Sequence, residues 1–410
     1  MSTPVAKRLT FLLTGYEPLG PEAHYRRFVR EIGRFRATWQ LEARVGDLVQ
    51  PEGRPLASWR VEVQGPDWRT ESEVRLLRWD DIVAEDMTAP VWRRLVGYLI
   101  AAADIAASGT FLRYALAYWR YALFAAYPAV LLILAAVLAA AGAWMWAALG
   151  IPGGAAGAAV AALVLFAGLI LFAGRRLHLD YMLSDWIFAR DMIRRRRPSI
   201  EARAQAFCAE IAGALRAGEA DEVVVLGHSL GAAWMVEAVG RLLAAHPDLV
   251  LRGPPLGLCG VGSSTLKIAL HPAAGWLRDS VRRIADQPAI TWAEYDSHVD
   301  FICFYKNNTV TALKLDAASV PVRRSIRLSR MLSPATWKRF RGNLLRIHRQ
   351  YVMGNERRYA YDFHMIACGP FRFADIVRHG ELLPDALGPD GSLAGARCRL
   401  EAPTAEPAIR

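Results

Sequence analysis

The sequence predicts an α/β fold in which a mostly parallel sheet is covered by helices on both faces, with an inserted two-helix transmembrane hairpin. Three observations predict it. Strand and helix signals alternate along the chain, as a parallel sheet requires. Residues 121–174 contain no charged side chain. A β-branched apolar run at residues 222–226 leads through a glycine-flanked serine into a stretch of small helix-forming residues.

The first 90 residues read as the first part of the α/β domain. A short apolar run near the amino terminus ends at Thr14-Gly15, which is too short for a secretory signal and fits a buried strand. The expected elements are a strand at 8–13, a helix at 22–38, and strands at 59–64 and 73–79.

Residues 91–197 are expected to form a membrane-associated insertion. A bilayer core of roughly 30 Å takes about 20 helical residues, so 126–149 and 155–173 are each long enough to cross it. The Gly-Pro segment between them predicts a tight hairpin. A buried soluble hairpin is the alternative, but soluble helices show a polar face and these two stretches show none.

Arginines on both sides of the hairpin predict its orientation. By the positive-inside rule both flanks are cytoplasmic, and the uncharged connecting loop lies on the far side. We therefore expect a two-pass protein of the cytoplasmic (inner) membrane, with both termini and the α/β domain in the cytosol. The arginines concerned are Arg113, Arg120, Arg175, Arg176 and the run 194–197.

The segment at 91–124, ahead of the first span, mixes arginines with tryptophan and tyrosine. We expect it to be mostly helical and partly interfacial, with its aromatic rings at the level of the lipid headgroups. A lid or a core helix is the alternative interpretation.

Residues 198–382 are expected to complete the α/β domain. The pattern predicts an amphipathic helix at 200–217, a strongly apolar strand at 222–226, and weaker strands at 255–260, 289–295 and 320–328. Residues 383–410, rich in Pro, Gly and Ala, are predicted to be a disordered tail.

The motif that carries chemistry is Gly227-His228-Ser229-Leu230-Gly231, a G-x-S-x-G sequence between a strand and a helix. A strand that turns sharply into a helix needs glycines on either side of the serine and pushes the serine hydroxyl to the top of the sheet. The helix amino terminus would also favour a developing oxyanion. Ser229 is therefore the predicted nucleophile, and a merely structural turn is the alternative.

Followed by Ala232-Ala233, this pentapeptide resembles the nucleophile elbow of lipases and esterases of the α/β-hydrolase superfamily. The resemblance covers most of the chain outside the hairpin in element order, but only the elbow is specific. The membrane hairpin departs from the usual pattern. The resemblance implies a catalytic serine, acid and histidine in that order along the chain.

The acid and the base would then follow residue 229. Asp300, in an S-x-x-D sequence beyond the predicted strand at 289–295, is the favoured acid, and Asp296 is the second choice. His348, some fifty residues beyond Asp300, is the favoured base, and His364 is the second choice. Either aspartate could instead cap a turn, and a core or surface role is the alternative for the histidines.

The resemblance also implies an oxyanion hole. One backbone N–H would come from Leu230, directly after the nucleophile, and another from the loop Gly15-Tyr16 after the first strand. A glycine there would let the backbone approach the substrate carbonyl. An ordinary turn at the strand end is the alternative.

The net charge of +11 predicts an anionic partner. Since no nucleic-acid-binding motif is present, we expect anionic membrane lipids rather than nucleic acid. Residues 317–355 contain nine arginines and lysines and no acidic residue, and a solvated basic face is the alternative. The five cysteines are scattered without a CxxC pair, so we expect no metal site, and the chemistry needs no cofactor.

Taken together, the sequence predicts a membrane-anchored, lipase-like serine hydrolase that cleaves a carboxylic ester of a lipid or another acyl substrate. A thioesterase or acyltransferase would use the same triad. A non-catalytic membrane scaffold that retains the fold is the alternative from another class.

Overall fold

The computed structural model describes residues 3–393 and divides the chain into two compact units. The sheet unit comprises Met1–Asp81, Ser199–Ala269 and Gly275–Arg410. The helical unit comprises Ile82–Pro198 and Leu270–Ala274.

One sheet of eight strands organises the sheet unit, in the order β2-β3-β4-β1-β5-β6-β7-β8. The pairs β2–β3 and β3–β4 are antiparallel, and the remaining neighbours are parallel. The prediction of an α/β fold with a mostly parallel sheet is therefore confirmed. The strands are β1 (Lys7–Leu13), β2 (Glu42–Val45), β3 (Leu56–Gly65), β4 (Trp68–Leu77), β5 (Glu222–His228), β6 (Leu256–Val261), β7 (Ile290–Asp296) and β8 (Val322–Ser325).

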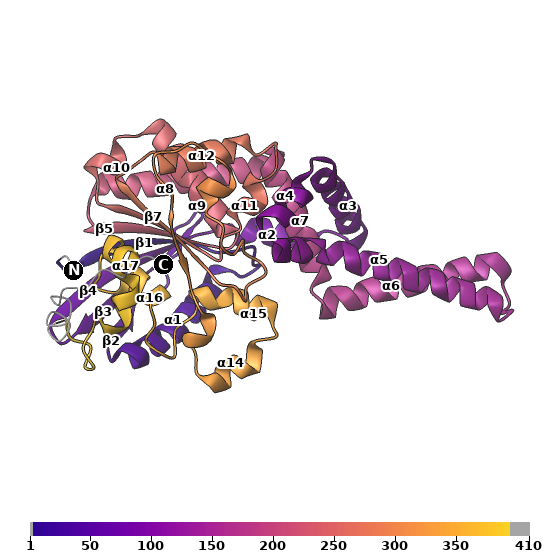
Figure 1. The fold of residues 1–410 in the computed structure, drawn as a ribbon, viewed down its shortest axis with the longest axis horizontal. Helices are drawn as coiled ribbons and strands as arrows, with labels where there is room; N and C mark the ends of the chain where they lie inside the picture. Colours follow the sequence, from indigo (N-terminus) through magenta and orange to yellow (C-terminus); the bar gives the residue numbers. More distant parts are fainter. Residues whose placement is uncertain (1–2, 394–410) are drawn as a thin grey trace, which may run out of the picture. The chain divides into compact units, whose positions relative to one another are not determined.

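Helices cover both faces of this sheet (Figure 1). Helices α8, α9 and α12 lie on one face, and α1, α16 and α17 lie on the other. Every residue of β5 is buried, as expected of a central strand covered on both faces. The α-helices of the sheet unit are α1 (Pro21–Trp39), α8 (Pro198–Ala217), α9 (Gly231–Ala245), α10 (Leu249–Arg252), α11 (Thr265–Ala269), α12 (Gly275–Ala285), α13 (Thr309–Ala312), α14 (Pro334–Phe340), α15 (Leu344–Arg349), α16 (Phe363–Cys368) and α17 (Phe373–His379).

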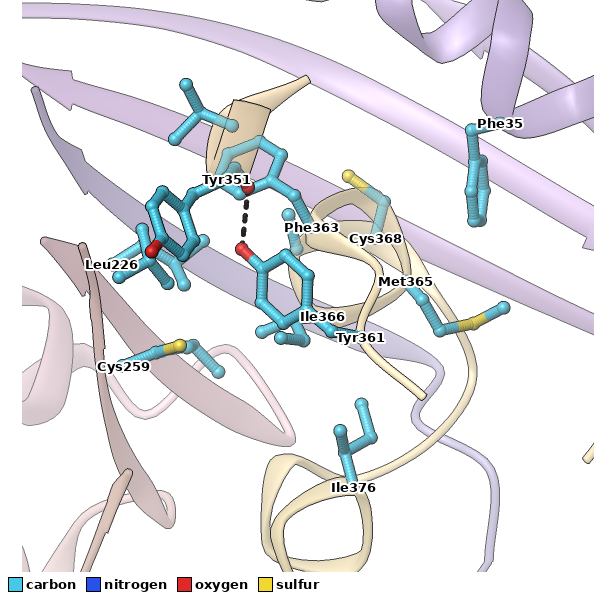
Figure 2. Close-up of a cluster of buried hydrophobic side chains, with 14 of the residues drawn as sticks. Phe35, Leu226, Cys259, Tyr351, Tyr361, Phe363, Met365, Ile366, Cys368 and Ile376 are labelled. Carbon is cyan, nitrogen blue, oxygen red and sulfur yellow. Dashed lines mark hydrogen bonds between the residues drawn. The ribbon is translucent and has the colours of Figure 1, made fainter. Parts of the chain in front are cut away.

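The hydrophobic core on the α1 and α16 side anchors the chain that follows α15. Figure 2 shows Tyr351 and Tyr361 packed among apolar side chains that include Leu226 of β5 and Cys259 of β6. The Tyr361 hydroxyl donates to the Tyr351 carbonyl oxygen at 2.6 Å. Because both rings are fully buried, this packing fixes the end of α15 relative to the central strands.

A buried ion pair ties the first and central strands to the carboxyl-terminal region. Arg8 of β1 contacts Glu222 of β5 at 2.7 Å. The same guanidinium donates to the carbonyl oxygens of Gly369 and Phe371, while the Glu222 carboxylate accepts from the Phe373 N–H. Both charges are thus paired and hydrogen-bonded, as buried charges need to be.

The helical unit contains α2 (Asp80–Thr88, which begins in the sheet unit), α3 (Val91–Ala107), α4 (Thr110–Ala117), α5 (Trp119–Ala148), α6 (Gly154–Arg176) and α7 (Leu179–Arg194). Helices α5 and α6 pack as a hairpin, and each is long and apolar enough to cross a membrane, as predicted. Helix α5 begins before the expected residue 126 because Tyr118 is the first residue with extended backbone on that side.

The bounds of the two compact units differ from those of the predicted domains. The break lies at residues 81–82 rather than 90–91, because Glu85 and Asp86 of α2 pair with Arg197 inside the helical unit. Residues 270–274 also belong to this unit: the Leu270 carbonyl oxygen accepts from Arg113. The second boundary falls at 198–199, one residue beyond the expected position.

The tail predicted to be disordered from residue 383 is placed up to residue 393. Leu383 and Leu387 are buried. Arg358 donates to the carbonyl oxygens of Leu387 and Gly388, and Trp68 Nε1 donates to that of Gly391. Proline and glycine here make turns that pack against the sheet unit. Residues 394–410 lie outside the described part of the chain.

Candidate active site

Ser229 lies at a strained turn between β5 and α9. Its φ is 55°, in the left-handed region that costs a non-glycine residue roughly 1–3 kcal/mol. A Cβ at Gly227 would lie 2.6 Å from the Ala232 Cα, and one at Gly231 would lie 2.2 Å from the Leu13 carbonyl oxygen. The strand therefore turns into the helix at this angle only with glycine at both positions.

Hydrogen bonds to the segment after β6 hold the turn. The Ser229 N–H donates to the Val261 carbonyl oxygen at 3.1 Å, and the Ser264 N–H donates to the Ser229 carbonyl oxygen at 3.1 Å. The two hydroxyl oxygens, Ser229 Oγ and Ser264 Oγ, are 3.5 Å apart. The Ser229 side chain is thus held by its backbone, and within residues 3–393 its hydroxyl makes this one long hydrogen-bond contact.

The structure brings Asp300 and His348 together. Asp300 Oδ2 lies 2.8 Å from His348 Nδ1, and both side chains are buried. A carboxylate can only accept, so Nδ1 carries the proton and Nε2 carries the lone pair. Within residues 3–393, Nε2 is buried without a hydrogen-bond partner. This tautomer is the one in which a histidine can take a proton from a serine.

Two contacts place His348 beside the elbow. The rings of His228 and His348 lie 4.8 Å apart between centroids, and His228 Nε2 donates to the His348 carbonyl oxygen at 2.9 Å. Gly262, which follows β6, adopts a φ of 53°, and a Cβ there would lie 3.2 Å from His348 Cε1. The residue before the serine and the residue after β6 therefore both contact the histidine.

Electrostatics keep Asp300 charged and His228 neutral. Burial acts to raise the pKa of Asp300, but His348 and the Ile302 N–H outweigh it and hold the pKa below its ordinary value. Burial, followed by the neighbouring His348, lowers the pKa of His228 to about 3. His228 therefore acts as a neutral hydrogen-bond donor to the backbone of α15.

The second-choice residues lie in other settings. Asp296 forms an ion pair with Arg323 at 2.6 Å and accepts from the Lys306 N–H. His364 packs against aromatic rings, with the Phe28 centroid 5.2 Å away, and neither ring nitrogen has a hydrogen-bond partner in the described chain. Burial lowers the pKa of His364 to about 3. The geometry thus joins Asp300 to His348 and leaves the other two apart from them.

The loop after β1 approaches the serine closely. A Cβ on Gly15 would lie 3.0 Å from Ser229 Cβ and 3.4 Å from Ser229 Oγ. Tyr16 is buried, with its ring 5.9 Å from that of Trp79. Leu230 immediately precedes α9, and its N–H makes no hydrogen bond among the described residues. The backbone at Gly15 therefore lies close to the hydroxyl, and the Leu230 N–H follows it directly in the chain.

One residue at this site was missed from the sequence. Glu17, two positions beyond Gly15, pairs with Arg27 of α1 at 3.0 Å and with Arg349 of α15 at 3.6 Å. Burial alone would raise its pKa, but Arg27, His228, His24 and Arg349 together lower it to about 2. Glu17 thus links the loop after β1 to the helix that carries His348. The sequence signal that could have identified Glu17 is a single acidic residue shortly after an apolar strand.

A surface cavity of about 650 Å³ lies elsewhere on the sheet unit. It is lined by residues at the start of β1, such as Lys7 and Arg8, and by Glu71 of β4 and Gly213 of α8. Ser229 follows the carboxyl end of β5, which is parallel to β1. The cavity, at the amino-terminal end of β1, therefore lies at the opposite end of the parallel strands from Ser229. Ligands of open α/β sheets bind at the carboxyl ends of the strands, which is the end where Ser229 lies.

Among residues 3–393, no group of three or more His, Cys, Asp or Glu side chains is arranged to hold a metal ion. The described cysteines, Cys208, Cys259, Cys303 and Cys368, are buried free thiols. Comparisons of the chain with protein-family models, with curated proteins and with solved structures found no match.

Proposed function

We propose that this protein is a membrane-anchored serine hydrolase of the α/β-hydrolase type that cleaves a carboxylic ester through an acyl-enzyme on Ser229. One observation carries the proposal: a serine at φ 55° on a strand-to-helix turn directly follows His228, whose ring lies 4.8 Å from that of His348, and His348 Nδ1 is hydrogen-bonded to a buried aspartate. A non-glycine residue held in a strained backbone conformation is characteristic of catalytic sites. An oriented histidine with a free Nε2 is what activates a serine.

In the first step the Ser229 hydroxyl oxygen attacks the acyl carbonyl carbon, and its proton passes to His348 Nε2. Asp300 stabilises the imidazolium and keeps Nδ1 as the donor. The carbonyl oxygen becomes an oxyanion, which accepts from the Leu230 N–H and from the loop at Gly15 and Tyr16. The ester bond breaks, and the leaving alkoxide takes the proton from His348.

In the second step water attacks the acyl-enzyme, with His348 again as the base. The Ser229–acyl bond breaks, the serine oxygen regains a proton, and a carboxylic acid leaves. The reaction uses side chains, backbone N–H groups and water, and needs no organic cofactor.

The membrane helices and the charge distribution support a lipid or another acyl ester as substrate, at the cytoplasmic face. The chain tethers its sheet unit to two helices suited to a bilayer, and arginines flank both of them. The basic segment 317–355 carries five exposed cations that have no acidic partner among the described residues, and these would bind anionic lipid headgroups. The five are Arg327, Arg330, Lys338, Arg339 and Arg341.

The test is labelling of the full-length protein in detergent with a fluorophosphonate, which reacts only with an activated serine. We expect labelling of the wild type and of Ser264→Ala, and none of Ser229→Ala or His348→Ala. Ser264→Ala is the matched control because its hydroxyl oxygen lies 3.5 Å from Ser229 Oγ. A folded wild type that does not label would refute the proposal in favour of a scaffold.

Substrate class is read in the same preparation. Hydrolysis of phospholipid or acylglycerol vesicles well above that of short soluble esters supports a lipid substrate. Faster cleavage of acyl thioesters than of esters would reassign the chain to thioesterase or acyltransferase chemistry, with the same residues.

A further inference from the structure

Helix α3 exposes its apolar face. Four large side chains point to the surroundings: Trp92 is 61% exposed, Val96 51%, Leu99 57% and Ile100 48%. Their spacing of i, i+4, i+7 and i+8 confines them to an arc of about 100° on a helix of 3.6 residues per turn. The exposure is therefore a continuous stripe along the helix.

The opposite face of α3 is the one that carries ionic contacts. Arg94, Tyr98, Ala101 and Ile105 are buried. Arg94 lies 3.5 Å from Asp180, at the start of α7. A soluble amphipathic helix turns its apolar stripe inward and its charges outward, whereas α3 turns its large apolar stripe outward and buries an arginine on the other face.

A second ionic contact lies near the other end of α3. Asp104 pairs with Arg190 at 3.2 Å and with Arg194, both near the end of α7. The two helices therefore run parallel, and α7 supplies charged partners near both of its ends.

The exposed apolar pattern continues beyond α3. The chain bends by 71° between α3 and α4, and α4 again exposes large apolar side chains. A single residue, Tyr118, separates α4 from α5, the first helix long enough to cross a membrane. The exposed side chains of α4 are Phe111 at 41%, Leu112 at 62% and Leu116 at 78%.

Two features identify lipid as the medium that covers this stripe. The chain passes directly from α4 into a membrane helix, so a bilayer is within reach of both segments. Arginines stack on tryptophans at the starts of α3 and α5, with Arg93 5.2 Å from the Trp92 ring and Arg120 5.5 Å from the Trp119 ring. Tryptophan and arginine together are typical of the headgroup layer.

Two further features argue against a crossing by α3. With 17 residues, α3 is about 25 Å long, shorter than a hydrocarbon core of about 30 Å. Its partner α7 carries Asp180, Asp185, Arg190, Asp191 and Arg194, which would be costly to carry into hydrocarbon. A helix packed along α7 therefore stays at the level of the headgroups.

We propose that α3 is an interfacial helix that lies in the plane of the membrane, with the stripe Trp92, Val96, Leu99 and Ile100 in the lipid and its ionic face on α7. The helical unit then holds the bilayer by two spans and by an in-plane helix ahead of them. This inference does not depend on the hydrolase proposal, since it uses the helical unit alone.

The experiment is site-directed spin labelling of the full chain in lipid nanodiscs, with nitroxides at Leu99→Cys and Ile100→Cys. Ile133→Cys, at the middle of α5, is the reference for the bilayer core, and exposed Gln205→Cys on α8 is the reference for water. Each variant also carries Cys398→Ser, so that the nitroxide reagent meets no other native cysteine outside the buried Cys208, Cys259, Cys303 and Cys368. The accessibility to oxygen and to a water-soluble nickel complex is measured at each site.

We expect oxygen-to-nickel ratios at 99 and 100 that are several-fold above the value at 205 and clearly below the value at 133. Ratios equal to that at 205 would place the stripe in water and overturn the proposal. Ratios equal to that at 133 would make α3 part of a crossing and also overturn it. Protection from both reagents would mean that protein covers the stripe, which again contradicts the proposal.

Discussion

Replacing Asp300 with asparagine tests the proposed site most directly. Asp300 Oδ1 accepts from the Ile302 N–H at 2.9 Å, and Oδ2 accepts from His348 Nδ1 at 2.8 Å. In Asp300→Asn the oxygen must stay on the Ile302 side, because an N–H cannot face another N–H in this buried site. The amide nitrogen then faces Nδ1 and donates to it.

That exchange forces His348 into the tautomer with the proton on Nε2, which cannot accept the Ser229 proton. The corresponding substitution in a serine protease triad lowers kcat by about 10⁴, or about 5 kcal/mol of transition-state stabilisation, and we expect a loss of that order. The geometry of the site should be retained, since asparagine is isosteric with aspartate.

The assay is kcat/KM on a chromogenic acyl ester, with the circular dichroism spectrum as the check of folding. Asp296→Asn is the matched control, because Asp296 pairs with Arg323 rather than with a histidine, and a folded Asp296→Asn protein should keep kcat/KM close to that of the wild type. A folded Asp300→Asn protein with near wild-type kcat/KM would refute the assignment. So would an equal loss in Asp296→Asn.

Three other substitutions test the parts around the site. Gly15→Ala should lower kcat without unfolding the protein, because its Cβ would lie 3.0 Å from Ser229 Cβ. Gly33→Ala on α1 is the control, since its Cβ would meet nothing within 4 Å, and its kcat should be unchanged. Equal kcat values for the two variants would show that Gly15 is not part of the site. Glu17→Gln should weaken the dependence of the unfolding free energy on pH in the acid range. The pKa of Glu17 is lowered from 4.5 to about 2, so its stabilisation is present above pH 4.5 and is lost as the pH falls towards 2. The free energy of unfolding contributed by this carboxylate is about 3 kcal/mol, measured by urea unfolding as a function of pH. A variant with the same pH dependence of stability as the wild type would contradict it. Arg8→Met should lower the free energy of unfolding by about 3–5 kcal/mol, because it leaves Glu222 buried and unpaired. Adding Glu222→Gln should recover part of that loss. No recovery in the double variant would argue against the ion pair as the cause.

The order of elements could be largely predicted from local patterns. The runs at 8–13 and 222–226 and the helix at 22–38 correspond to β1, β5 and α1 within a few residues. Strand β2 was missed, since its four residues, Glu42–Val45, alternate between exposed and half-buried at the sheet edge and carry little apolar signal. The strand predicted at 320–328 is longer than the observed β8, because only Val322–Ser325 pair with β7.

The sequence by itself determined the apolar spans, the alternation of strands and helices and the elbow at Ser229, because each depends on residues close together in the chain. Only the tertiary structure decided which aspartate meets which histidine. Asp300 and His348 are 48 residues apart, and their contact depends on how α15 packs against His228 and Gly262. Asp296 and His364 were the second choices from the local sequence. They are separated from the site by long-range partners, Arg323 and the ring of Phe28, that no local pattern encodes.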